Sequence, residues 1–308
     1  MPDRRQSRGR RPATPPAAPE LPDGPVPIAT GTAEVTRSPD DPRAVTLFVN
    51  GVPSSHLDLD DPTWLEFEYM QHMAAILTHT TDTDAHGRDA GGPPLDAVHL
   101  GAAGCALPRW LEAVRPGSRQ IAVDVDAELL RLVRTWFALP RSPRLRLRAG
   151  EARAVLAALP TGSADVVVRD VFAPDVTPAH LRTVEFLQEV CRVLRPGGLY
   201  LANCADRPPL TTARAEVATA RAVLDDVLLV AEPGQLRGRR YGNLVIAGRA
   251  PGGPTRPVPP ALARHLRTLP VPAALVTGDE LAAFAGSSPQ LRDEAPEVTP
   301  GDDDGRAP

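Results

Sequence analysis

Two aspartates follow short apolar segments of the sequence, and both positions suit the binding of a small ligand. Asp124 follows residues 120–123, and Asp170 comes shortly after residues 166–168. In folds that alternate strands and helices, ligands bind at the carboxyl ends of the strands, and an acidic residue after the second strand is the usual ribose contact. We therefore expect Asp124 to bind a ribose and Asp170 to contact a ligand. The plainer alternatives are a helix cap or a solvated strand end for Asp124 and a loop cap for Asp170.

Small residues lie close to these aspartates in the sequence. Residues 101–106 read GAAGCA and follow the first strand of the expected unit. Such a turn lets the backbone approach a ligand closely. Gly150 and Glu151 follow a later strand, and Glu151 is either a ligand contact or a carboxylate in the first turn of a helix. We expect Cys105 to fill space rather than to act as a nucleophile.

The elements that must position these residues alternate between residues 95 and 250. Strands are expected at 97–100, 120–123, 145–148, 166–168, 199–203, 227–231 and 243–247, and helices at 108–114, 127–138, 152–159, 180–194 and 212–224. This alternation predicts a mostly parallel sheet with right-handed crossovers. The last two strands have no helix between them, which predicts an antiparallel hairpin at one edge. The predicted fold class is α/β, with a Rossmann-like core of seven strands.

Composition divides the rest of the chain. Residues 1–27 are rich in Pro, Arg and Ala and are expected to be disordered. Residues 28–80 are expected to form a small β element, with an Asn50-Gly51 hairpin turn, and a helix at 62–77 capped by Asp61. Residues 81–250 form the predicted core. A Pro-rich extension, 251–308, is expected to be partly disordered, with short helices at 260–269 and 280–284.

The segment 189–203, EVCRVLRPGGLYLAN, resembles the helix, turn and strand that close the core of class I methyltransferases that use S-adenosylmethionine (AdoMet). The layout of residues 46–248 is similar to the spermidine synthase (polyamine aminopropyltransferase) family, in which a small β domain and a helix precede such a core. The sequence FVNGV at 48–52 and the helical stripe at 65–77 resemble that opening.

This resemblance implies a transferase that takes an S-adenosyl sulfonium donor, either decarboxylated AdoMet or AdoMet, and uses no metal. Its partner would be a small-molecule amine or other small acceptor. The small β element and the helix that includes Leu65 suggest a dimer contact, so we expect a homodimer. Asp170 would be the catalytic base. The residues implied to bind the donor are Gly101, Ala103, Gly104, Asp124, Val125, Gly150, Glu151 and Asp170. Those implied to bind the acceptor are Tyr69, His72 and Asp175, although Tyr69 and His72 also fit a helix stripe that packs in the core.

The sequence departs from the family pattern mainly on the acceptor side. Gly104 stands where the family has an aspartate that contacts the amine, and Ala173 replaces a second aspartate after Asp170. A diamine such as putrescine carries two charges, and burying an unpaired charge is costly. Three functions therefore stay open: aminopropyl transfer to an amine, methyl transfer from AdoMet to a small molecule, and nucleoside binding without catalysis.

Composition excludes several other classes of function. The chain has no lysine, its 34 basic residues are all arginine, and its net charge is −4. Without a basic patch we expect no nucleic-acid partner. The three cysteines are far apart, which argues against zinc. The basic N-terminus is followed by no apolar segment, and no run reaches the roughly 18 apolar residues of a membrane helix. We therefore expect a cytoplasmic protein that has no membrane partner.

Overall fold

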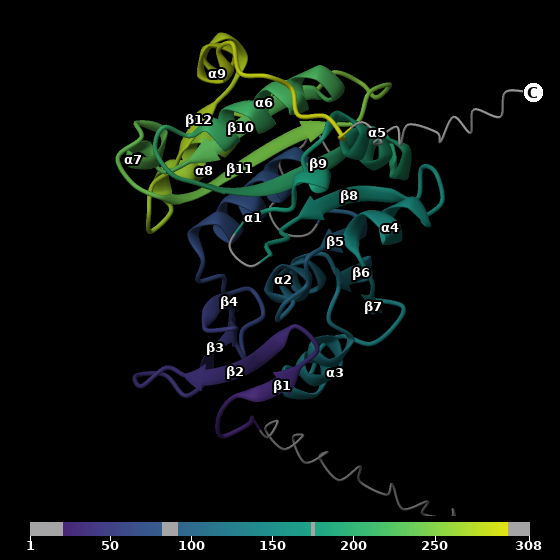
Figure 1. Ribbon diagram of the computed structural model, residues 1–308, viewed down its shortest axis with the longest axis vertical. Coiled ribbons are helices and arrows are strands. Elements are labelled where there is room, and N and C mark those ends of the chain that lie inside the picture. The colour runs from purple at the N-terminus through teal and green to yellow at the C-terminus, as the bar shows by residue number, and fades with distance from the viewer. Residues whose placement is uncertain (1–20, 82–91, 174–175, 295–308) are drawn as a thin grey trace, which may run out of the picture.

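The computed structural model describes residues 21–81, 92–173 and 176–294, which form two sheets. The small sheet contains four antiparallel strands in sequence order: β1 (Val26–Ile28), β2 (Gly31–Arg37), β3 (Ala44–Val49) and β4 (Val52–Asp58). The hairpin expected at Asn50-Gly51 joins β3 to β4, and both turn residues have positive φ, as such tight turns require. Figure 1 shows this sheet at one end of the molecule, beside α2 (Ala106–Val114) and α3 (Ala127–Trp136).

The large sheet confirms the predicted α/β class and gains one strand. Its order is β12-β10-β11-β9-β8-β5-β6-β7. The strands from β9 to β7 run parallel, and β11, β10 and β12 are antiparallel. The eighth strand, β12, comes from the Pro-rich extension and pairs with β10. The bounds are β5 (Asp96–Leu100), β6 (Arg119–Asp124), β7 (Leu145–Ala149), β8 (Ala164–Arg169), β9 (Leu194–Asp206), β10 (Asp225–Ala231), β11 (Gly242–Arg249) and β12 (Ala274–Val276).

Helices cover both faces of the large sheet and define two apolar layers. One layer joins α1 (Glu68–Thr80), α2, α3 and α8 (Pro260–Thr268) to the sheet. The other joins α4 (Ala152–Ala157), α5 (Val184–Val193), α6 (Thr211–Val223) and α9 (Gly278–Ala285). Along β9, Leu199 and Leu201 belong to the first layer, whereas Tyr200 and Ala202 belong to the second, as the alternation of a strand dictates. Two short elements complete the chain, a 3-10 turn at Ala179–Leu181 and α7 (Pro233–Leu236).

Order begins earlier in the chain than expected. Residues 26 and 27 were predicted to belong to a disordered tail, but they lie in β1 and pair with β2. Leu21 packs against the first apolar layer. The Pro and Ala content of this stretch hid a short segment that buries apolar surface, which is enough to hold it in place.

The first helix also differs from the prediction. It begins at Glu68 rather than at Pro62, and it continues to Thr80. The carboxylate of Asp61 accepts hydrogen bonds from both the backbone N–H and the hydroxyl of Thr63. This local turn competes with helix formation, so residues 62–67 approach the helix as a turn followed by extended backbone. The shift moves Tyr69 into the first turn of α1.

Other element bounds shift by smaller amounts. The helix expected at 180–194 is α5, which begins at Val184 with Thr183 as its cap and follows the 3-10 turn. Residues 195–198 were expected to form a turn, but they lie within β9, where the pairing with β8 is irregular. Asp126 caps α3 by accepting the N–H of Leu129, as predicted.

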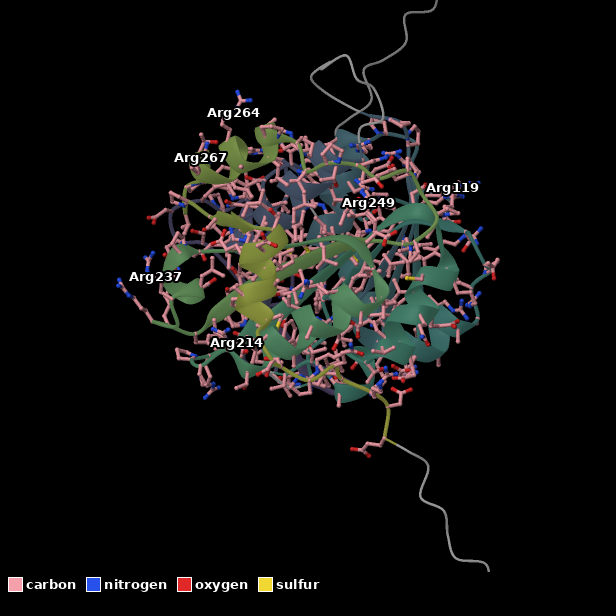
Figure 2. The ribbon with its side chains drawn as sticks, turned by 90° about the horizontal axis from the view of Figure 1, so that it is seen from above. Arg119, Arg214, Arg237, Arg249, Arg264 and Arg267 are labelled. Atoms are coloured by element: carbon pink, nitrogen blue, oxygen red, sulfur yellow. The ribbon has the colours of Figure 1, made fainter. Side chains whose placement is uncertain are left out.

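Arginines do structural work that lysines could not do in the same way. Figure 2 shows Arg237, Arg264 and Arg267 pointing outward, and all three are exposed. Arg249 is buried instead, and it donates to the carbonyls of Gly197 and Thr80 at 2.9 and 2.5 Å. The forked guanidinium can bind two separate carbonyls at once, so this side chain fastens the end of α1 to the sheet. In the described part of the chain, no helix is long and apolar enough to cross a membrane.

Candidate functional site

The turn after β5 brings the two predicted aspartates to one edge of the sheet. Gly101 has φ of +88°, and a Cβ atom there would lie 2.0 Å from the carbonyl oxygen of Asp170. Its N–H donates to the carbonyl of Val123, while the N–H of Asp170 donates to the carbonyl of Leu100. Only glycine combines this backbone angle with such a close approach. Gly101 therefore joins the carboxyl ends of three neighbouring strands.

Asp124 is held against the turn by the backbone. Its Oδ2 accepts the N–H of Ala103 at 3.2 Å, and its Oδ1 accepts the N–H of Asp126 at 3.0 Å. Burial raises the pKa of Asp124, and these N–H donors partly oppose the rise. The helix cap suggested as an alternative is taken by Asp126. Lone pairs remain on the Asp124 oxygens, and these could accept two hydroxyl groups. The neighbouring Val125, which the family resemblance also implied as a donor contact, is 66% exposed.

Gly104 faces the small sheet. Its N–H donates to the Ser55 hydroxyl at 2.9 Å, and a Cβ atom at Gly104 would lie 2.7 Å from the Cβ of Ser55. The position where the family has an aspartate is therefore packed against strand β4 in this chain. Cys105 beside it is fully buried, and burial raises the pKa of its thiol to about 12. A thiol that stays protonated fits the expected space-filling role.

Glu151 forms the cap of α4. Its two carboxylate oxygens accept the N–H groups of Arg153 and Ala154 at 2.9 and 2.7 Å, and His180 Nε2 lies 3.1 Å from Oε1. Burial would raise the pKa of Glu151, but these donors outweigh it and the pKa is lowered. Gly150, just before it, donates its N–H to the carbonyl of Asp124 at 2.9 Å. The pair thus belongs to the same edge as Asp124.

Asp170 directly follows β8 and is bound by two neighbouring side chains. The Tyr69 hydroxyl donates to Oδ2 at 2.9 Å, and the Asn203 amide donates to Oδ1 at 2.9 Å. Burial raises the pKa of Asp170, while these two hydrogen bonds partly oppose the rise. Burial and the Asp170 charge raise the pKa of Tyr69 well above its usual value, so it stays a phenol. The carboxylate is therefore fixed by two neutral donors.

A buried ion pair supports this arrangement from behind. Arg169 is fully buried, contacts Glu216 at 2.7 Å and donates to the Asn203 carbonyl at 3.0 Å. Burial alone would lower the pKa of Arg169, but the charge of Glu216 more than offsets it, so the guanidinium stays charged. Breaking one side of such a pair leaves an uncompensated charge in the interior. The backbone around Asp170 and Asn203 is consequently well anchored.

Asn203 is the site residue that the sequence analysis missed. The alternation along β9 places it on the same face as Leu199 and Leu201, toward α1. Its Oδ1 is buried and has no hydrogen-bond partner within residues 21–81, 92–173 and 176–294. A polar residue at the end of an apolar strand, next to the strand that carries Asp170, was the signal available in the sequence.

His72 lies one helical turn after Tyr69 and is 1% exposed. Neither of its ring nitrogens has a partner among the described residues, and burial lowers its pKa to about 4. The imidazole is therefore neutral near pH 7, and its role in acceptor binding stays a prediction. Asp175 lies outside the described residues. Within the described ranges, no group of three His, Cys, Asp or Glu side chains could hold a metal ion.

Comparisons with known proteins bear on this geometry. The methyltransferase domain family matches residues 98–202. The crystal structure of a probable spermidine synthase from Corynebacterium glutamicum is 35% identical, has a TM-score of 0.80, and aligns over 90% of this chain and 98% of that one. The chain belongs to the spermidine synthase-like family. Its core is a class I methyltransferase fold, as the sequence predicted.

Curated relatives of this family member are more distant. The polyamine aminopropyltransferase of Chromobacterium violaceum is 25% identical over 149 residues, which are 48% of this chain and 53% of that protein. The chain thus spans about half the length of this relative. The human eEF1A lysine and N-terminal methyltransferase is 28% identical over 125 residues, which are 37% of this chain and 18% of that protein. Both relatives are transferases by name, but the two names denote transfer of different groups.

Proposed function

We propose that this spermidine synthase-like protein is a transferase that binds an S-adenosyl sulfonium donor and transfers its aminopropyl group to a small amine. One observation carries the proposal: Asp170 is held by Tyr69 and Asn203 directly beside the Gly101 turn and within the same sheet edge as Asp124. This arrangement supports the proposal, in which Asp170 accepts the proton and Asp124 binds the ribose from the two sides of one turn.

The proposed reaction assigns a separate task to each side. Asp124 and the turn hold the nucleoside, and Asp170 accepts a proton from the acceptor ammonium. The amine nitrogen then attacks the carbon next to the sulfonium sulfur, the carbon–sulfur bond breaks, and a neutral thioether leaves. Burial raises the pKa of Asp170, which makes it a stronger base than an ordinary aspartate. Fixed orientation supplies much of the remaining rate, as in other bimolecular transfers.

A second function, methyl transfer from AdoMet, is favoured by two specific observations. Gly104 carries no carboxylate that could repel the carboxylate of AdoMet, and Ser55 and Leu57 occupy the space where a side chain would extend. The match to the methyltransferase domain and the eEF1A methyltransferase relative agree with this alternative. The acceptor would then be a small molecule with a nucleophilic nitrogen or oxygen.

The two reactions release different products, which makes a direct test possible. The full chain is incubated with a panel of amines and either decarboxylated AdoMet or AdoMet, and the released nucleoside is identified by chromatography. Methylthioadenosine indicates aminopropyl transfer, and S-adenosylhomocysteine indicates methyl transfer. Binding of either donor without any product would support a non-catalytic nucleoside-binding protein. Absence of binding by both donors and by methylthioadenosine would refute all three functions.

Asp124→Asn tests the proposed ribose contact in the same experiment. Loss of a charged hydrogen-bond acceptor is expected to weaken methylthioadenosine binding about 10-fold or more, as measured by calorimetry. Glu128→Gln is the matched control, because Glu128 pairs with Arg131 on the surface one turn further along. Equal affinity of Asp124→Asn and the wild type would remove Asp124 from the site. We also propose that the chain forms a homodimer, as expected from the sequence. Light scattering of the protein as it elutes from a size-exclusion column gives its molar mass and tests this proposal.

A further inference from the structure

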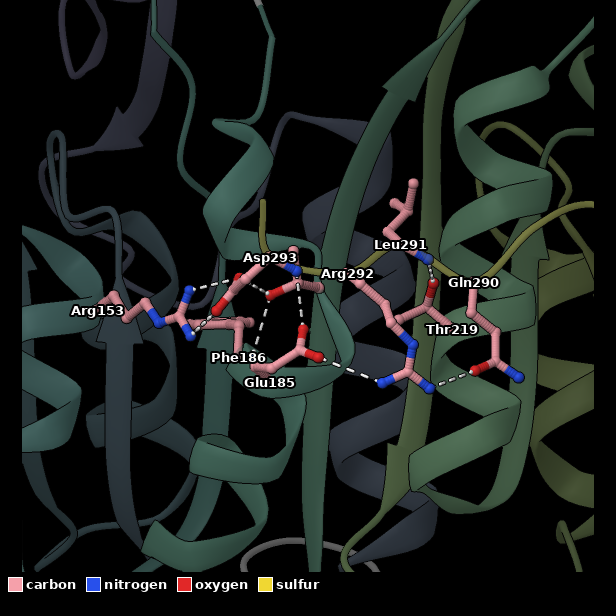
Figure 3. Close-up of polar contacts among 9 residues, drawn as sticks. Arg153, Glu185, Phe186, Thr219, Gln290, Leu291, Arg292 and Asp293 are labelled. Atoms are coloured by element: carbon pink, nitrogen blue, oxygen red, sulfur yellow. Dashed lines mark hydrogen bonds and ion pairs between the residues drawn. The ribbon is translucent and has the colours of Figure 1, made fainter. Parts of the chain in front are cut away.

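A segment near the C-terminus crosses the helices on the second face of the sheet. We call residues 290–293, which follow α9, the C-terminal strap (Figure 3). The Leu291 N–H donates to the Thr219 hydroxyl of α6 at 2.8 Å, and the Leu291 carbonyl accepts the Val184 N–H at 2.8 Å. Val184 begins α5, so the strap satisfies one of the backbone N–H groups that a helix leaves unpaired at its start.

Asp293 makes the most concentrated set of contacts in the strap. Its carboxylate accepts two N–H groups of Arg153 at 2.8 and 2.6 Å and the Thr183 hydroxyl at 2.7 Å. Its own N–H donates to Glu185 at 2.9 Å. A two-pronged arginine–carboxylate contact fixes orientation as well as distance. Figure 3 shows Arg153 reaching the strap from α4, while Glu185 lies beneath it on α5.

These contacts continue toward the predicted donor site. Arg153 also donates to the carbonyl of His180 at 3.1 Å. The ring of His180 lies 3.1 Å from Glu151, the residue implied by the family resemblance to contact the nucleoside. Asp293 thus reaches Glu151 by two routes: through Arg153 alone, whose backbone N–H donates to Glu151, and through Arg153 and then His180. Arg153 and Asp293 are 140 positions apart in the sequence, and their side chains are only 27% and 35% exposed.

We propose that Asp293 is a positioning residue for the donor site: through Arg153 and His180 it sets the orientation of Glu151. This inference rests on the proposed function, because it assumes that Glu151 faces the bound nucleoside. The competing explanation is a brace that adds stability to α4, α5 and α6 and has no effect on the ligand. The two explanations differ in whether Asp293 and Glu151 act on affinity together or independently.

A double-mutant cycle on the full chain separates them. Calorimetry gives the dissociation constant of methylthioadenosine for the wild type, Asp293→Asn, Glu151→Gln and the double variant. We expect Asp293→Asn to weaken binding about three- to tenfold, and the double variant to be no weaker than Glu151→Gln alone, since coupled residues are not additive. Arg292→Ala is the control, because Arg292 lies on the same strap but its ion pair is with Glu185 of α5 rather than with Arg153 of α4.

Each outcome of the cycle has a definite meaning. Unchanged affinity in Asp293→Asn, or fully additive losses, would overturn the inference and leave the strap as a brace. An equal loss in Arg292→Ala would do the same. If the wild type itself does not bind methylthioadenosine, the proposed function fails instead. Should Asp293→Asn not fold, Arg153→Lys keeps the charge but loses the two-pronged contact, and the same cycle with Glu151→Gln decides the question.

Discussion

The two sides of the candidate site differ in whether their buried polar atoms have hydrogen-bond partners in the protein. On the predicted donor side, at the ends of β5, β6 and β7, Asp124 and Glu151 each accept two backbone N–H groups. On the predicted acceptor side, Asn203 Oδ1 of β9 is buried and finds no partner among the described residues, and the same holds for both ring nitrogens of His72 on the neighbouring α1. The carboxylates of the first side are held by backbone N–H groups, whereas the second side has buried polar atoms with no hydrogen bond from the described residues.

This difference indicates how the site would distinguish its two ligands. Under the proposed function, a donor side fixed by its own backbone would bind the nucleoside part that any S-adenosyl compound shares with little rearrangement. Buried polar groups without partners cost free energy until a ligand or water satisfies them. An acceptor that supplies those hydrogen bonds gains that energy, so discrimination between acceptors is expected to come from Asn203 and the residues around Asp170.

Among the substitutions that test this difference between the two sides, the largest effect is expected for Asp170→Asn. Asp170→Asn should lower turnover about 10²- to 10⁴-fold, because a neutral amide accepts no proton, while methylthioadenosine affinity stays within twofold of the wild type. Single-turnover product release measures the first quantity and calorimetry the second. Asp165→Asn is the control, since Asp165 lies at the other end of the same strand and pairs with Arg195. Normal turnover by Asp170→Asn would exclude this residue as the base.

The pH dependence of stability supplies an independent check on Asp170. Its pKa in the folded protein is raised above the usual 3.8, so the folded state holds this proton more tightly than the unfolded state. The stability that this proton provides is present at pH values below 3.8 and is lost as pH rises through the folded pKa. Asp170→Asn should therefore unfold at a higher temperature than the wild type at pH 7, by an increment that shrinks toward pH 4.

A smaller effect is expected on the donor side at Gly101. Gly101→Ala places a Cβ against the Asp170 carbonyl in a left-handed conformation, which should cost about 2–3 kcal/mol and lower the unfolding temperature by roughly 5–10 °C. Gly162→Ala is the control, because its φ is +61° but nothing lies within 4 Å of a Cβ there. It should lose only roughly 2–4 °C. Equal losses in thermal unfolding would show that the close approach is unimportant.

The smallest effect is expected for a substitution of His72. The result shows whether His72 packs in the core or binds the acceptor. If His72 only packs in the core, His72→Leu removes an unpaired buried imidazole and should raise the unfolding temperature by roughly 2–4 °C. If it binds the acceptor, the variant should raise the KM for the acceptor and leave the donor KM unchanged. Met73→Leu, a change of similar volume at the next buried position, should alter neither KM.

The sequence was most informative where local rules act alone. The cap residue Asp126 was predicted because it precedes a helix, and the structure confirms it. Asp124 and Asp170 were selected because each follows a buried strand, and their ligand contacts stay predictions. Helix α1 was placed six residues too early, since its start is decided by the turn that Asp61 makes with Thr63. Asn203 and the strap were missed for another reason. Their contacts join residues 33 and 140 positions apart, and no local pattern encodes such a pairing.

The short strand β12 has a consequence for the solubility of the protein. It pairs with Leu229, Val230 and Ala231 of β10, which are fully buried apolar residues. A chain that ended before residue 274 would present this apolar strand as an unpaired edge, which is a template for intermolecular β-pairing and aggregation. The extension therefore covers the edge of the sheet. A chain shortened to end before residue 274 is expected to precipitate even if it still folds.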